Sequence, residues 1–420
     1  MMKLSLSNLS LLLITPSLLL MSQAAQASSG HGTSDISSDS ASSGWQADIN
    51  LSYREENGPN MLGFLPTNSH QQQAGLSLNH ADLSYQANLP TEFSGTQISD
   101  QQIGRIALSY HSDDVELSEA WIENRWNTNN LRLTTGKYLP RIGFLNHVHQ
   151  HAQTLIQSPL MNKVYWGDEL SEAGVRLEWL PKLGKRLMGI QLRHSLNILG
   201  GDHLNSNDNT LAALYQLEAS QQLGALQVAA LINGYYTNVS DRGLFLFDLS
   251  NNTHVHTNSG YTEFFDGDIL HLGAGLKLSY ASEFGDFNYQ GEYAQRDEKG
   301  LLYSASSDLA DLSMTSNGQY HQLWWTSPQQ QWQLAMRYDY LYSDVEVANT
   351  SDNSLDDSRL NNNDATPKRI SWMASWLFGA HNTNQNSSSQ QRLQMIYSDG
   401  PDWDAYPAQL EIHLLQSFRF

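Results

Sequence analysis

Apolar and polar residues alternate along several stretches of the chain. In 332–342 the even-numbered residues are Trp, Leu, Met and Tyr, while the odd-numbered residues include Gln333, Arg337 and Asp339. Successive side chains of a β-strand point to opposite faces, so this period of two predicts a strand with one apolar and one polar face. A soluble sandwich also alternates, but aromatic residues at both ends of the apolar rows favour a barrel with lipid outside and water inside. The same alternation recurs in 188–196, 270–280 and 370–378.

The end of the chain continues this pattern. Its apolar row is interrupted once, by Gln416, and consists of Leu410, Ile412, Leu414, Phe418 and Phe420. This stretch resembles the terminal strand of bacterial outer-membrane barrels, whose closing aromatic residue is read by the assembly machinery. The resemblance implies that Phe420 contacts this machinery and that the protein resides in the bacterial cell outer membrane.

The predicted fold class is all-β: a transmembrane antiparallel β-barrel of about 16 strands in residues 45–420, with short periplasmic turns and long outer loops. Fourteen or eighteen strands also fit the pattern, and the connections at 112–113 and 381–389 break the alternation of short and long. The long outer loops are expected at 55–73, 142–172, 236–267, 297–317 and 343–368. The strands are expected to begin near Trp45, Gly75, Gln102, Val115, Asn130, Ala173, Arg186, Thr210, Ala225, Ile269, Phe287, Gly318, Gln331, Arg369, Gln390 and Gln409.

The N-terminal segment has the features of an export signal. A Lys near the start is followed by a short apolar run and by Ala25-Gln26-Ala27, which predicts a signal peptide over 1–27. Residues 28–44 contain mostly Ser, Gly, Asp and His, and they predict a disordered leader.

Composition narrows the function classes. The chain has no Cys, which excludes disulfides and thiolate metal sites, and its net charge of −20 argues against nucleic acid and favours cations as partners. Neither a Gly-x-Ser-x-Gly elbow nor a His-Glu-x-x-His pair is present, so we do not expect an enzyme.

Three histidines stand at alternate positions in the stretch FLNHVHQHAQ: His147, His149 and His151. Neutral imidazole is a good ligand for zinc, and the same predicted loop supplies Asp168, Glu169 and Glu172. Transient zinc binding is therefore one interpretation, and no other cofactor is expected. The alternative interpretation is that all three are solvated loop histidines. This interpretation is favoured more strongly for His70, His254 and His256.

The polar faces of the predicted strands supply candidates for the lumen wall. Mixed charges on an inner wall can line a pore or serve only solvation and barrel stability, and both interpretations stay open. The candidates are Arg176, Glu178, Arg193, His271, Lys277, Arg337, Asp339 and Arg419.

A family resemblance is carried by 63–89, 115–123, 173–182 and, most clearly, by GKYLPRIGFLNHVHQHA in 136–152. These stretches resemble a family of small porin-like outer-membrane proteins, often described as zinc-regulated or TonB-dependent-receptor-like and similar in architecture to phosphate-selective porins. Val148 and Gln150 depart from the family, which has more polar and proline residues there. The best match is the pattern Gly-x-x-Asn-x-x-His-x-His, with Gly136, Gly143, Leu145, Asn146, His149 and His151 as its core.

The resemblance implies a third outer loop that folds into the barrel and sets the pore constriction. We therefore expect an outer-membrane channel for diffusion of small hydrophilic solutes, with a preference for cations or a link to uptake of divalent metal. The alternative is a closed surface receptor or structural barrel whose loops bind a metal or a partner. Expected partners are outer-membrane lipids, the barrel-assembly machinery, small solutes or divalent cations, and further copies of the chain in a homotrimer.

Overall fold

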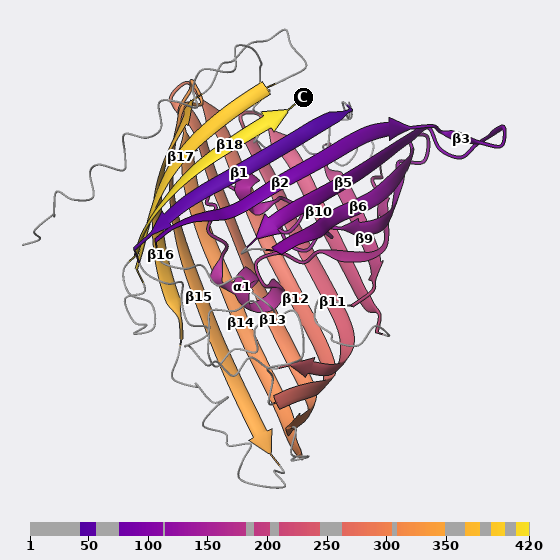
Figure 1. Cartoon of the computed structure of the whole chain (residues 1–420), viewed down its shortest axis with the longest axis vertical. Coiled ribbons are helices and arrows are strands. Elements are labelled where there is room, and N and C mark those ends of the chain that lie inside the picture. Colours follow the sequence, from indigo (N-terminus) through magenta and orange to yellow (C-terminus); the bar gives the residue numbers. More distant parts are fainter. Residues whose placement is uncertain are drawn as a thin grey trace, which may run out of the picture.

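A closed barrel of antiparallel strands forms the body of the protein (Figure 1). The computed structural model describes residues 43–55, 75–111, 114–181, 189–201, 210–243, 263–304, 309–348, 366–378, 388–399 and 409–419. The predicted signal peptide, most of the predicted leader and Phe420 lie outside these residues.

Sixteen of the strands close the barrel, and β3 and β4 form a separate two-stranded sheet. Each barrel strand pairs with its neighbours in the chain, and β1 pairs with β18 to close the ring, so the sheet leaves no unpaired edge. The strands are β1 (Gly44–Arg54), β2 (Gly75–Leu89), β3 (Glu92–Phe93), β4 (Thr96–Gln97), β5 (Gln101–His111), β6 (Asp114–Trp126), β7 (Leu131–Tyr138), β8 (Glu172–Trp179), β9 (Gln191–Leu199), β10 (Ala212–Leu223), β11 (Leu226–Gly243), β12 (Glu263–Ser282), β13 (Gly285–Ser304), β14 (Leu309–Thr326), β15 (Trp332–Ala348), β16 (Lys368–Phe378), β17 (Ser388–Asp399) and β18 (Gln409–Arg419).

The predicted all-β barrel with sixteen strands is confirmed, but several strand boundaries were wrong. The chain 297–317 was expected to be a loop, whereas β13 and β14 pair there through Tyr303 and Leu309. In the same region of the wall, β12 begins at Glu263, six residues before the predicted start. These extensions carry acidic residues such as Asp268 on their outward side. Where the wall extends beyond the hydrocarbon layer, strands can pair without an apolar outer face. The sequence of these extensions therefore lacks the apolar outward row expected of a membrane strand.

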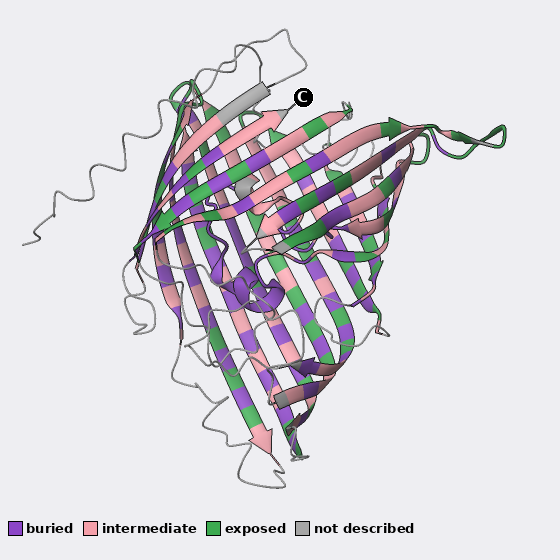
Figure 2. Ribbon diagram, viewed as in Figure 1, coloured by how far each residue is buried: buried purple, intermediate pink, exposed green. Residues whose placement is uncertain are grey.

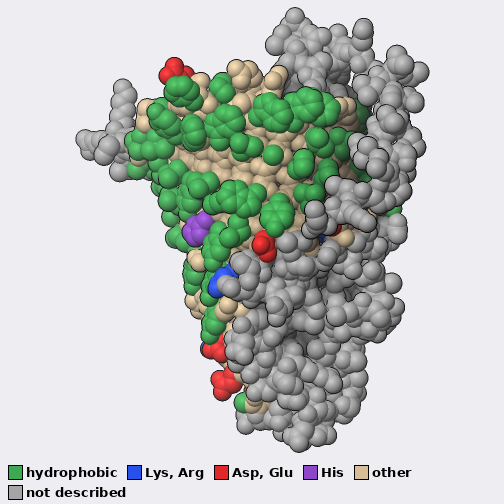
Figure 3. Space-filling model, turned by 90° about the vertical axis from the view of Figure 1, so that its left-hand side faces the viewer, with side chains coloured by type: hydrophobic (Ala, Val, Ile, Leu, Met, Phe, Trp, Pro, Cys, Tyr) green, Lys and Arg blue, Asp and Glu red, His purple; other side chains and the backbone are tan. Residues whose placement is uncertain are grey.

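The outer face of the barrel is apolar over a belt that matches a membrane. On β12 the outward row runs from Leu270 to Tyr280, about 33 Å along the strand at ~3.3 Å per residue. At a strand tilt of ~40° this row covers roughly 25 Å along the barrel axis, the usual height of a lipid-facing band. Figure 3 shows hydrophobic side chains gathered in such a band. The outward side chain of Trp372 on β16 is about half exposed, at 54%. The fold is therefore that of a transmembrane barrel.

The connection between β7 and β8, residues 139–171, lies inside the barrel and is called the third loop below. It contains the short 3₁₀ helix η3 (Gln150–Ala152) and the helix α1 (Leu160–Trp166). Figures 1 and 2 show α1 in the middle of the barrel, where all seven of its residues are buried. In the described part of the chain, no helix is long and apolar enough to cross a membrane.

Candidate functional site

The third loop crosses the lumen and reaches the opposite wall. It leaves the wall at β7, and its segment 156–158 contacts β16, β17 and β18. The amide of Gln157 donates to Glu411 on β18 at 2.9 Å, and the backbone N–H of Ile156 donates to Gln394 on β17 at 3.0 Å. Backbone groups buried away from water must find such partners, so these side chains fix the path of the loop.

A buried ionic cluster holds the start of α1. Asp339 on β15 accepts a hydrogen bond from the backbone N–H of Leu160 at 3.1 Å. The same carboxylate accepts from Arg337 Nε at 3.1 Å and from Arg369 Nε at 2.9 Å. Both arginines also donate to the carbonyl oxygen of Ser158, at 3.1 and 2.6 Å. We call Arg337, Asp339 and Arg369 the clamp, because three charged side chains with no exposed surface hold the loop against the wall.

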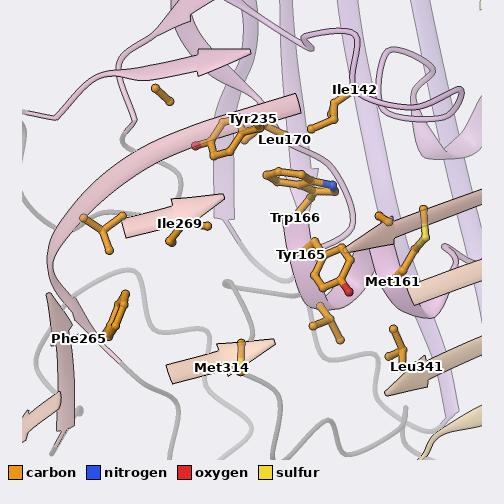
Figure 4. Close-up of a cluster of buried hydrophobic side chains, with 14 of the residues drawn as sticks. Ile142, Met161, Tyr165, Trp166, Leu170, Tyr235, Phe265, Ile269, Met314 and Leu341 are labelled. Carbon is orange, nitrogen blue, oxygen red and sulfur yellow. The ribbon is translucent and has the colours of Figure 1, made fainter. Parts of the chain in front are cut away.

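Apolar packing surrounds the rest of α1. Trp166 packs edge-on against Tyr235 on β11, with ring centroids 5.1 Å apart (Figure 4). It also packs edge-on against His271 on β12, with ring centroids 4.9 Å apart. A Cβ on Gly318 would lie 2.6 Å from the Cβ of Met161, so a glycine is needed where β14 passes the helix. The cluster around α1 also includes inward residues of β10 to β15, among them Leu214, Phe265, Ala294, Leu312 and Leu341.

This packing explains why the helix is buried on all sides. In a loop that lies along one wall, the pore-facing side chains would be exposed to water, but α1 has none. In the part of the chain that the structure describes, the third loop therefore fills the lumen at the level of α1.

The base of the third loop is tied by residues of the family-like pattern. Asn146 donates to the carbonyls of Pro140 and Leu170, at 2.8 and 2.9 Å, and accepts from the Leu170 N–H at 2.6 Å. Gly143 has φ +68°, a left-handed conformation that favours glycine, and it lies directly against the carboxylate of Glu292. Glu292 in turn accepts the Phe144 N–H at 3.0 Å. Gly143 and Asn146 thus have structural roles in shaping the loop.

The structure describes the side chains of two of the three loop histidines, His147 and His149. His149 Nε2 lies 2.6 Å from Glu119 Oε1 on β6. Burial lowers the pKa of His149, but the hydrogen bond with Glu119 and the nearby Glu169 outweigh it and raise this pKa to about 9. His147 lines a cavity described below, and the side chain of His151 lies outside the described residues. No group of three His, Cys, Asp or Glu with metal-binding geometry occurs among the described residues.

The acidic residues expected to complete that site point to separate partners. Asp168 lies 3.5 Å from Lys163 Nζ, and Glu172 accepts the Gly201 N–H at 3.1 Å. Glu169 lies near His149, and burial raises the pKa of Glu169 to about 7. Zinc binding stays a prediction, and protonation of His149 would oppose it, because a protonated imidazole has no lone pair for a metal. His70, His254 and His256 lie outside the described residues.

A cavity of about 620 Å³ lies inside the barrel beneath the third loop, toward the end at which β1 begins. The side of the cavity toward the loop is formed by Phe144, Val148 and His149. Among the residues that the structure describes, seven basic and four acidic side chains line it, together with six glutamines. The basic residues are Arg105, Arg125, Arg132, Arg141, Arg176, Arg193 and Lys277, and the acidic ones are Glu119, Glu123, Glu178 and Glu218.

The structure divides the predicted lumen residues into two groups. Four of them line the cavity: Arg176, Glu178, Arg193 and Lys277. His271, Arg337 and Asp339 also point inward, but they contact the third loop and are buried by it. The side chain of Arg419 lies outside the described residues. Whether any of these residues borders a conducting pore stays a prediction.

Several residues of the site were not predicted. Arg369 completes the clamp, and Glu119 and Arg141 hold the loop at its near end through His149 and Glu178. Arg369 directly precedes the outward residue Ile370, so the alternation of β16 was a signal that it points inward. Arg141 belongs to a loop and follows no such period.

Comparisons with known proteins add little beyond the fold. No family model matches the chain. An uncharacterised protein of Aquifex aeolicus is 23% identical over 281 residues, which cover 64% of this chain, and the chain spans about half, 55%, of that protein. The trimer form of the outer-membrane protein OmpT of Vibrio cholerae has a TM-score of 0.48 at 9% identity, with 90% of this chain and 98% of that chain covered. OprB of Pseudomonas putida has a TM-score of 0.48 at 10% identity, with 90% and 94% covered.

Proposed function

We propose that this protein is a porin-like channel of the bacterial outer membrane that passes small hydrophilic solutes and is closed or narrowed by its third loop. The observation that carries the proposal is the cavity of about 620 Å³ with charged and amide walls inside a lipid-facing barrel. If the interior served only stability, we would expect side chains to fill the lumen along its whole length, as they do around α1. The outer-membrane location is supported by the apolar outer belt, since a single-chain barrel without edges is the β architecture that lipid tolerates.

Opening of this channel requires the third loop to move. The loop is joined to the far wall by apolar packing of Leu155 and Ile156 and by polar contacts, through the clamp and through Gln157, Gln394 and Glu411. Water that enters the lumen can replace the polar contacts, whereas it cannot replace apolar packing. A small displacement of 156–160 would therefore begin at the clamp.

Ion preference and uptake of divalent metal are further parts of the proposal. The net charge of −20 would favour cations, whereas the side chains that line the cavity carry more positive than negative charge. Uptake of divalent metal would need the loop histidines, and its test is a block of conductance by micromolar Zn²⁺ that is lost when His147, His149 and His151 are all changed to Ala. An unchanged block would show that the histidines are not the site. Catalysis is not part of the proposal.

Assembly partners also belong to the proposal. The apolar belt is large enough for lipids or for further copies in a homotrimer, and analytical ultracentrifugation in detergent distinguishes a trimer from a monomer. Contact with the barrel-assembly machinery would involve Phe420.

A second function is favoured by the complete burial of α1. A barrel that never opens could serve as a surface receptor or as a structural element, with its outer loops binding a metal or a partner. Liposome swelling separates the two functions. A channel lets small sugars enter liposomes and swell them at a rate that falls with sugar size, whereas liposomes with a permanently closed barrel would not swell.

A further inference from the structure

The charge inside the cavity differs in sign from the charge of the whole chain. Seven basic and four acidic side chains of the described residues line it, although the protein carries a net charge of −20. Because field lines are focused inside a low-dielectric wall, this local excess acts on a solute more strongly than distant surface carboxylates do.

The positive charges are concentrated on one side of the cavity. They lie on five consecutive barrel strands, β5 to β9, and on the third loop, with Lys277 of β12 as the exception. The remaining wall is lined largely by neutral amides, of which Gln227, Gln290 and Gln322 come from β11, β13 and β14. A solute in the cavity would thus meet a basic wall on one side and mostly uncharged hydrogen-bonding groups on the other, where Glu218 and Lys277 are the charged residues.

Several arginines share a few carboxylates. Glu178 lies 3.0 Å from Arg141 Nε, 3.9 Å from Arg176 Nε and 4.0 Å from Arg193 Nε. Glu123 lies 2.6 Å from Arg125 Nε and 3.4 Å from an Nη of Arg176. Single carboxylates orient these arginines but carry too little charge to neutralise them. This arrangement keeps the guanidinium groups fixed around the cavity with a net positive potential.

We propose that this cavity binds small organic anions with carboxylate or phosphate groups and that the channel prefers anions over cations. Guanidinium groups donate paired hydrogen bonds in a plane that matches both groups, and prior orientation by Glu123 and Glu178 lowers the entropic cost of binding. The volume of about 620 Å³ limits the solute to a small molecule rather than a polymer. Passage of the anion rests on the proposed channel function, but its binding does not.

The test combines reversal potential with equilibrium binding. In a planar bilayer under a KCl gradient, the wild-type channel should show the reversal potential of an anion-selective pore. Arg176→Gln and, separately, Arg132→Gln should shift it toward cations. Lys299→Gln is the matched control, because it removes one positive charge from the exposed outer side of β13 and should leave the reversal potential unchanged.

Binding is measured by calorimetry on the refolded barrel, with succinate and inorganic phosphate as probes and succinamide as the neutral analogue. We expect binding of at least one anion, no binding of succinamide, and a loss of about tenfold in affinity in Arg176→Gln but not in Lys299→Gln. The stronger of the two probes shows whether carboxylate or phosphate is preferred.

The outcomes separate this inference from the channel function. A wild-type channel that is cation-selective, or whose selectivity is unchanged in both arginine variants, would overturn the inference and leave the channel intact. If the wild type does not conduct, the channel function fails and calorimetry alone decides. Anion binding lost in the arginine variants would then support the inference, and absence of binding by both anions would overturn it.

Discussion

Replacing Asp339 by Ala is expected to release the third loop from the wall. In the closed barrel, Asp339 is the shared acceptor for Arg337, Arg369 and the Leu160 N–H, and none of the three charged side chains has exposed surface. Removal of one partner from a buried ion pair costs about 3–5 kcal/mol, because the remaining charge is left in a low-dielectric site. With the loop displaced, lumen water would solvate both arginines. The substitution therefore raises the free energy of the closed state relative to the open state.

The expected magnitude is an increase in the opening equilibrium constant. At about 1.4 kcal/mol for each factor of ten, a cost of about 3–5 kcal/mol corresponds to a rise of roughly a hundredfold to several thousandfold. The arginines keep their contacts with the Ser158 carbonyl, so we expect the lower end of this range. Single-channel recording measures the effect as the ratio of open to closed time.

Asp344→Ala is the control for this variant. It removes a carboxylate from the same strand, β15, but on the exposed outer side, away from the third loop. The reasoning would be refuted if Asp339→Ala, shown to be folded by heat-modifiable migration on gels, had the same open-to-closed ratio as Asp344→Ala.

Three further predictions concern other contacts. His149 has a folded pKa of about 9, above the unfolded value of about 6.5, so its contact with Glu119 stabilises the loop fully below pH ~6.5 and is lost as pH rises through about 9. Channel opening should therefore increase over this pH window in the wild type and not in His149→Gln; parallel pH profiles would contradict this. Trp166→Ala should weaken docking of α1 by about 3–5 kcal/mol and speed hydrogen exchange of its amides, whereas Trp372→Ala on the lipid face should not. Removal of Phe420 should impair assembly in cells far more than refolding in detergent, and equal losses would show that it acts through packing.

The barrel could be predicted from the sequence because lipid and water impose a period of two on each strand. Leu272, Trp372 and Leu334 all point outward as their alternation predicted. The prediction failed where the wall leaves the lipid, since Leu312 and Met314 point inward there and Asp311 points outward. This stretch was interpreted as a loop. Its alternation is reversed, with apolar residues inward, which is typical of a wall that packs against an apolar segment inside the barrel.

The candidate site was predictable only in part, for a different physical reason. The period of β15 shows that Arg337 and Asp339 point inward, but inward polar residues can face water or a folded loop. The choice depends on contacts with Ser158 and Leu160, which are about 180 residues away in the chain and follow no local pattern. The same limit applies to His149, whose spacing suggested a metal ligand and whose partner, Glu119, lies at a bulge between β5 and β6.

Replacement of part of the third loop tests directly whether this loop closes the channel. Residues 156–168, which include α1, are replaced by a short Gly-Ser linker, and the conductance of this variant in planar bilayers is compared with that of the wild type. We expect the wild type to open rarely or with small conductance. The variant, still heat-modifiable on gels, should form large and steadily open channels. Equal conductance of the two proteins, or silent membranes with both, would contradict a channel that the third loop closes.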